Sequence, residues 1–167
     1  MRWLIWAMVL IGAFGIARVL FSASDDRAEW MRWAPSVDLE ALAPGEQRVL
    51  GWKGNGYIVA ALTPAEVKAV HDVDPRTLPF PEPLEERLLR VEINGETRYF
   101  ATIAARVPIG SACHVSRRFY GWEDPCNCGV FDFAGRTFGK SSCANLPRPN
   151  FVIADRTLYL HPNQPLD

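Results

Sequence analysis

The sequence predicts a mostly β protein: a small antiparallel β domain with one short helix, carried on a single N-terminal transmembrane helix. Three observations predict this class, namely an apolar run at the N-terminus, short strand-like segments between tight turns, and one capped helix start. The chain has 167 residues, of which 49% are hydrophobic, so we expect one globular domain plus an appendage. Its net charge of −1 gives no electrostatic reason to bind nucleic acid.

The apolar run extends from Trp3 to Phe21, and its only charged residue is Arg18. A helix of roughly 20 such residues is long enough to cross the hydrocarbon core of a membrane. We therefore expect residues 1–23 to form a transmembrane anchor and residues 24–35 to form a tether that leads to the domain, residues 36–167.

The charges that flank the apolar run indicate its orientation. Arg2 precedes it, whereas Asp25, Asp26 and Glu29 follow it. The positive-inside rule then places the N-terminus in the cytoplasm and the domain outside. A cleaved signal peptide with Ser22–Ser24 as its cleavage site is the alternative. Both interpretations export the domain, so disulfides are permitted.

Strand-like segments separated by turn residues fill most of the domain. They are Val37–Leu42, Gln47–Trp52, Tyr57–Leu62, Arg87–Ile93, Glu96–Ala104, Phe151–Ile153 and Leu158–Leu160. We expect hairpin turns at Gly54–Gly56, at Asn94-Gly95 and at Ala154–Thr157, because Asn-Gly and similar turn residues between two such runs favour antiparallel pairing.

A single short helix is predicted to begin at Pro64 and to end near Val70 or His71. Thr63 is a suitable N-cap residue, proline is favoured at the first helical position, and Glu66 occupies the third.

The stretch 109–150 contains all four cysteines and one of the three histidines. It is rich in turn residues, so we expect loops that present these side chains, and no other stretch could hold a cofactor. The cysteines are Cys113, Cys126, Cys128 and Cys143, and the histidine is His114. Two disulfides, with three possible connectivities, are favoured over a metal site. Cys126 and Cys128 are closer than zinc ligands usually are, so an exported zinc or thiol-disulfide protein is the weaker hypothesis.

Several segments share residues with one known family. The most specific is Phe131–Phe138, which reads FDFAGRTF, and the others are Val37–Leu39, Pro44-Gly45, Trp52 with Gly54, Thr63-Pro64, Asn145-Leu146 and Pro149. Taken in order, these segments resemble the Rieske iron-sulfur subunit of cytochrome bc complexes from Val37 to Leu160. The resemblance implies a Rieske-like fold on a membrane anchor and tether, with residues 109–150 as former cluster-binding loops.

The ligand positions that the resemblance implies depart from the family pattern. A Rieske centre takes two cysteine thiolates and two histidine imidazoles, from a Cys-x-His and a Cys-Pro-Cys-His motif. An ungapped alignment places Ala112, His114, Asp124 and Asn127 at these four positions. Because only His114 is of the required type, we predict no catalytic residue, no cofactor-binding or metal site and no bound cofactor.

The family's disulfide joins its two cluster loops, and Arg117 falls on one of its cysteine positions. The resemblance therefore favours Cys113 paired with Cys126 or Cys128, which leaves Cys143 for the remaining cysteine. Arg117 and the adjacent Arg118 fit either a solvated loop with aromatic packing beneath it or a docking surface.

The resemblance implies an accessory or structural subunit of a respiratory cytochrome bc-type complex, not catalytic by itself. The implied partners are cytochrome b and cytochrome c1 subunits, at an inner, energy-transducing membrane with the domain on the periplasmic side. The alternative is a functional iron-sulfur subunit of ubiquinol-cytochrome c reductase. In that case an atypical set such as Cys113, His114, Cys126 and Cys128 would hold a 2Fe-2S cluster and pass electrons from quinol to cytochrome c1.

Overall fold

The computed structural model describes residues 29–108, 115–125, 129–138 and 143–163. The predicted anchor, 1–23, lies outside these ranges, as do residues 24–28 of the predicted tether. No helix within the described ranges is long and apolar enough to span a membrane. The chain divides into two compact units, Met1–Ala34 and Pro35–Asp167. The first is described only from residue 29, and residues 29–31 are helical.

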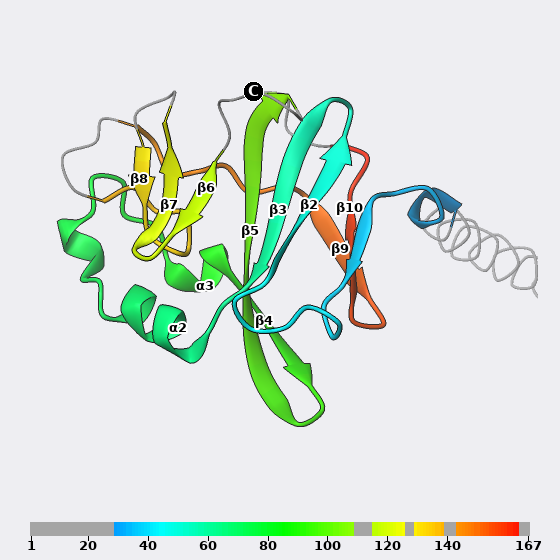
Figure 1. Cartoon of the computed structure of the whole chain (residues 1–167), viewed down its shortest axis with the longest axis horizontal. Helices are drawn as coiled ribbons and strands as arrows, with labels where there is room; N and C mark the ends of the chain where they lie inside the picture. The colour runs from blue at the N-terminus through cyan, green and yellow to red at the C-terminus, as the bar shows by residue number, and fades with distance from the viewer. Residues whose placement is uncertain (1–28, 109–114, 126–128, 139–142, 164–167) are drawn as a thin grey trace, which may run out of the picture. The chain divides into compact units, whose positions relative to one another are not determined.

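The second unit is built from three antiparallel sheets (Figure 1). The large sheet has the strand order β2-β3-β5-β4, the small sheet β6-β7-β8 and the terminal sheet β1-β10-β9. Their strands are β1 (Ser36–Asp38), β2 (Gln47–Trp52), β3 (Asn55–Ala61), β4 (Leu88–Ile93), β5 (Glu96–Pro108), β6 (Ser116–Arg118), β7 (Gly121–Asp124), β8 (Gly129–Phe131), β9 (Phe151–Ala154) and β10 (Thr157–Leu160). The predicted mostly β, antiparallel class is confirmed.

The prediction of one short helix is incomplete. Besides α2 (Pro64–His71), the described residues include the one-turn helix α3 (Leu84–Arg87) and the 3-10 helix η1 (Pro75–Thr77). Both lie in the proline-rich connection between α2 and β4. Prolines at the start of a helical turn are compatible with such short helices, because the missing N–H has no intrahelical acceptor there.

Helix α2 begins as predicted. The Glu66 N–H donates to Thr63 Oγ1 at 3.3 Å, and the Thr63 N–H donates to Glu66 Oε2 at 2.7 Å. This reciprocal capping box satisfies two backbone donors that a helix start otherwise leaves unpaired.

Two hairpin turns confirm their predictions. Asn94 and Gly95 take positive φ values of 53° and 81°, as a two-residue turn between twisted antiparallel strands requires. Asp155 and Arg156, with φ of 47° and 64°, turn the chain between β9 and β10. Strand β5 continues past the predicted end at Ala104.

The first hairpin turn lies one residue earlier than predicted. Lys53 and Gly54 occupy the positive-φ positions, at 48° and 83°, and Asn55 pairs with Trp52. A shift of register by one residue would move every side chain of β3 to the opposite face. The register of the whole strand therefore decides where the turn falls.

Only the beginning of the predicted strand Val37–Leu42 is a strand. Ser36–Asp38 pair with β10, and the chain then bends. Leu39 and Leu42 are both fully buried in one apolar cluster. Residues three apart point to opposite faces of a strand, so a continued strand could not bury both in one core.

The central strand β3 of the large sheet is buried on both faces. Alternate residues of β3 enter different clusters: Ile58 and Ala60 face one, and Tyr57 and Val59 face the other. The first cluster includes residues of α2 and of the small sheet, and the second includes residues of the terminal sheet. In Figure 1 the small sheet and the terminal sheet accordingly lie to either side of the long strands β3 and β5.

Candidate functional site

The candidate site is the small sheet together with the segments that it carries. Of the predicted site residues, the structure describes Asp124 and Cys143. The others lie outside the described residues; they are Ala112, Cys113, His114, Cys126, Asn127 and Cys128. The structure therefore describes the base of the site, which is the small sheet with the turn after β8 and the segment after Cys143.

Asp124 ends β7. It pairs with Gly129 at the start of β8, and it is only 8% exposed. Because Asp124 pairs with Gly129, the two strands are joined by a connection of four residues, Pro125–Cys128. This connection contains two cysteines and no histidine. A Rieske centre takes one imidazole from the corresponding loop.

Cys143 contacts the turn that follows β8. Its carbonyl accepts a hydrogen bond from Thr137 Oγ1 at 2.8 Å, and the residue is disulfide-bonded. The other three cysteines lie outside the described residues, so the pairing remains a prediction.

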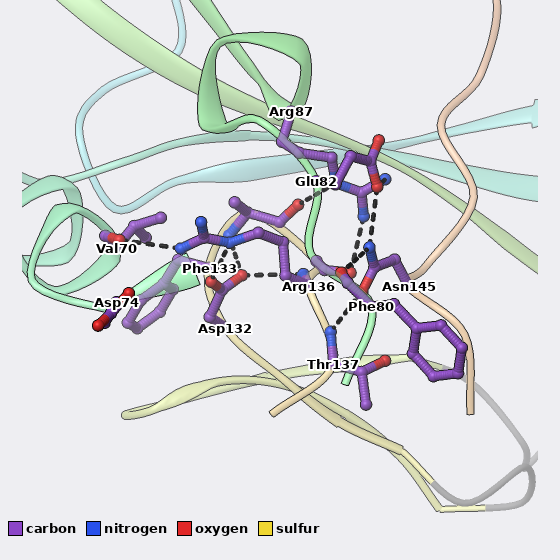
Figure 2. A network of polar contacts seen from close by, with 12 residues as sticks. Val70, Asp74, Phe80, Glu82, Arg87, Asp132, Phe133, Arg136, Thr137 and Asn145 are labelled. Atoms are coloured by element: carbon purple, nitrogen blue, oxygen red, sulfur yellow. Dashed lines mark hydrogen bonds and ion pairs between the residues drawn. The ribbon is translucent and has the colours of Figure 1, made fainter. Parts of the chain in front are cut away.

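The turn after β8 is organised by Asp132. Its carboxylate accepts hydrogen bonds from the Ala134 and Arg136 N–H groups, each at 2.9 Å, and pairs with Arg136 Nε at 2.7 Å. Arg136 Nη2 donates to the carbonyl of Val70, near the end of α2, at 2.9 Å. Figure 2 shows Arg136 held between these two partners. The ion pair is almost fully buried, so it depends on this complete set of acceptors.

Arg87, the last residue of α3, approaches the same turn from the other side. Its guanidinium donates to the carbonyls of Ala134 (3.1 Å), Gly135 (2.7 Å) and Leu146 (2.8 Å). Glu82 Oε2 lies 3.4 Å from Nη1. Burial lowers the pKa of Arg87, and the charge of Glu82 opposes that shift. From its sequence, Arg87 was expected at the start of a strand; it instead ends α3, and no local signal predicted these contacts.

Asn145 fixes the segment that follows Cys143. Its Oδ1 accepts from the Thr137 N–H at 2.9 Å, while its Nδ2 donates to the carbonyl of Phe80 at 3.0 Å and to Glu82 Oε2 at 2.8 Å. One amide therefore joins the segment after Cys143, the turn after β8 and the proline-rich connection (Figure 2). In the sequence, only the family resemblance pointed to Asn145.

Of the two interpretations of Arg117, a solvated loop or a docking surface, the solvated loop is wrong. It lies in β6 and makes a two-point contact with Glu66: Nη2 to Oε2 is 2.6 Å and Nε to Oε1 is 3.2 Å. The neighbouring Arg118 is half-exposed and pairs with Glu123 at 2.7 Å. Strand alternation explains the contrast, because adjacent residues of a strand point to opposite faces.

The described polar groups of this base are satisfied by one another and by backbone carbonyls. Asp132, Arg136, Arg87 and Asn145 all have protein partners, so their role is to hold the shape of the turn and of the segments beside it. Within the described ranges, no three His, Cys, Asp or Glu side chains gather in the way metal ligands do.

Known proteins resemble the chain along most of its length. It is 28% identical over 165 residues to the ubiquinol-cytochrome c reductase iron-sulfur subunit of Rhodospirillum rubrum, covering 94% of this chain and 88% of that protein. It is 29% identical to the mitochondrial Rieske subunit of the cytochrome b-c1 complex of Neurospora crassa, over 71% of this chain and 49% of the relative. For the corresponding Candida albicans subunit the identity is 25%, over 87% and 71%.

No family model matches the sequence. The relatives nevertheless are all named as Rieske or iron-sulfur subunits and match most of the chain. The described structure has the mostly β, antiparallel organisation expected from the resemblance. These similarities, over most of the chain, support the Rieske iron-sulfur subunit family of ubiquinol-cytochrome c reductase for this protein.

Proposed function

We propose that this chain is a membrane-anchored Rieske-fold protein without the usual 2Fe-2S centre, and that it serves as an accessory or structural subunit of a respiratory cytochrome bc-type complex. The observation that carries the proposal is the donor set at the positions of the family's ligands. Ala112 has no donor atom, and Asp124 and Asn127 offer a carboxylate and an amide where the centre takes a thiolate and an imidazole. These residues do not fit a Rieske centre.

The cysteines support this proposal. Cys143 is disulfide-bonded, and the chain contains four cysteines in total. An intrachain bond to Cys143 leaves two cysteines, which is enough for a second disulfide. Two disulfides would stabilise the segments around the small sheet by restricting the unfolded chain.

The buried polar network supports the persistence of the fold without a cluster. Asp132, Arg136, Arg87 and Asn145 connect the turn after β8 to α2, to the proline-rich connection and to the segment after Cys143. Since these contacts are all within the protein, the base of the small sheet can keep its shape when no metal is bound. A docking surface can therefore outlast the redox chemistry of a family.

The proposed partners and location follow from the relatives. Those proteins are named as subunits of ubiquinol-cytochrome c reductase or of the cytochrome b-c1 complex. For this chain we expect cytochrome b and cytochrome c1 type subunits as partners. We expect a single-pass anchor in the energy-transducing membrane, with the N-terminus cytoplasmic and the domain periplasmic.

The first test is the metal and thiol content of the chain, purified in detergent from membranes without added thiols. We expect no stoichiometric iron or acid-labile sulfide, and no Rieske-type signal in low-temperature electron paramagnetic resonance after dithionite reduction. We also expect no free thiols after denaturation, and four after reduction. Two irons per chain with a Rieske-type signal would contradict the proposal.

The second test concerns the complex. Affinity purification of the tagged full chain from mildly solubilised membranes should bring down b- and c-type haem, measured by reduced-minus-oxidised difference spectra. A matched purification of the chain without residues 1–35 controls for contacts made by the domain alone. Recovery of the chain without haem proteins would count against membership of such a complex.

The alternative function is a working electron carrier of ubiquinol-cytochrome c reductase with an atypical cluster. The observation in its favour is that all three relatives are named as Rieske or iron-sulfur subunits. The candidate donors are Cys113, His114, Cys126 and Cys128. The test is His114→Ala in the assembled complex, with His161→Ala as the matched control: an unchanged rate of quinol oxidation would rule the alternative out.

A further inference from the structure

We infer that Arg117 and Glu66 form a latch, called the Arg117 latch below, which holds the small sheet against the large sheet and lets the two separate as cooperative units when it is broken. This inference does not rest on the proposed function, because it concerns contacts between described residues whether or not the chain binds a cluster.

The latch connects the small sheet to three other elements. Arg117 leaves β6 and binds both oxygens of Glu66 in α2. It also donates to the carbonyl of Gly45, before β2, at 2.8 Å, and to the carbonyl of Ala61, at the end of β3, at 3.2 Å. A planar guanidinium with five N–H donors can make this set of contacts at once, and an ammonium group cannot.

The surroundings of the latch strengthen it. The side chains of Arg117 and Glu66 are only 14% and 18% exposed, so water screens the pair poorly. The guanidinium also lies over the rings of Trp122 and Phe133, at 5.8 and 5.9 Å from their centroids. These two aromatic residues belong to the cluster through which the small sheet packs on the large one.

Glu66 has a second task, which couples the latch to helix α2. The same carboxylate that binds Arg117 accepts hydrogen bonds from the N–H and hydroxyl groups of Thr63, the N-cap residue. The start of α2 and the position of the small sheet are therefore set by one side chain. The exposed Arg118–Glu123 pair, by contrast, lies within the small sheet and spans no boundary.

The latch predicts a specific pattern of local opening. Native-state exchange can distinguish opening of one cooperative unit from global unfolding. Without Arg117, the partly buried Glu66 loses its counter-charge, and the carbonyls of Gly45 and Ala61 lose a donor. The free energy of opening of the small sheet should fall while the strand pairing of β3 with β5 stays intact.

The experiment is hydrogen exchange measured by mass spectrometry on the full chain in detergent, with Arg117→Met and, as the matched control, Arg118→Met. We expect amide exchange in residues 115–124 and 129–137 to become at least about tenfold faster in Arg117→Met, a change that corresponds to about 1.4 kcal/mol. Exchange in residues 57–61 and 99–103 should stay the same. Arg118→Met should leave both regions unchanged.

Two further variants keep the test decisive. If Arg117→Met does not fold, Arg117→Lys replaces it in the test, because lysine retains the charge but lacks the planar guanidinium. Amide exchange in the small sheet should then be accelerated to a smaller degree. In the double variant Arg117→Met/Glu66→Gln, exchange in the small sheet should be no faster than in Arg117→Met. Equal acceleration in both regions, or none in the small sheet, would overturn the inference.

Discussion

The small sheet and the large sheet are stabilised by different kinds of contact. Strands β3 and β5 of the large sheet are buried on both faces by apolar side chains. The small sheet packs through apolar side chains as well, but the sheet and the turn after β8 are also held by arginines that bind backbone carbonyls. They are Arg117 of β6, Arg136 of the turn and Arg87 of α3. Apolar contacts tolerate small shifts, whereas hydrogen bonds weaken steeply with distance and angle. The orientation of the small sheet therefore depends on directional polar contacts in addition to apolar packing.

The largest effect is expected from removing a buried polar contact, the pair of Asp132 with Arg136. Asp132→Asn leaves the Arg136 guanidinium, which is 1% exposed, without its counter-charge. We expect a loss of about 3 to 5 kcal/mol in the free energy of unfolding, measured by urea denaturation with tryptophan fluorescence. Glu123→Gln, which removes the exposed partner of Arg118, is the control and should cost less than about 1 kcal/mol. Equal losses in the two variants would contradict a structural role of the buried pair.

Truncation of a core side chain tests the apolar packing of the large sheet. Leu158 of β10 is fully buried against the large sheet, and Leu158→Ala should cost about 2 to 5 kcal/mol. Because this cavity lies in the cluster shared with β3 and β5, the loss should appear as global unfolding in hydrogen exchange. A loss confined to β9 and β10 would show that the terminal sheet opens by itself.

Asn145 offers a smaller and more local effect. Asn145→Ala removes the acceptor of the Thr137 N–H and the donor to Phe80, and we expect a cost of about 1 to 3 kcal/mol. Asn145→Asp keeps an acceptor for Thr137 but places a carboxylate against Glu82, so it adds charge repulsion to the lost contact with the proline-rich connection and should cost more than Asn145→Ala. If both variants are as stable as the parent, the amide has no positioning role.

The smallest effect concerns an exposed ion pair. Hydrogen bonds from the Arg76 side chain and backbone lower the pKa of Asp74 from its usual value of 3.8. The ionised form is thus favoured in the folded state, and this contribution is present above the unfolded pKa and is lost as the pH falls through the folded one. Arg76→Met should raise the Asp74 pKa, measured by NMR titration. An unchanged value would show that the side-chain pair does not persist in solution.

Local signals in the sequence determined the parts of the fold that depend on neighbours in the chain. The capping box of Thr63 and Glu66 and the turn at Asn94-Gly95 involve residues within four positions of each other. Their geometry follows from backbone preferences that the residue types carry with them. The family was likewise evident from the run Phe131–Phe138 and the order of the other shared segments.

The tertiary structure alone decided the roles of Arg87, Arg117 and the two leucines after β1. Arg87 binds carbonyls 47 to 59 positions away, and Arg117 binds a carboxylate 51 positions away. No periodicity or short motif encodes such a pairing, because an arginine has the same local preferences on a surface and in a buried network. Leu39 and Leu42 leave the strand pattern for the same reason. Their burial depends on the position of a distant core, and only the folded chain brings that core to them.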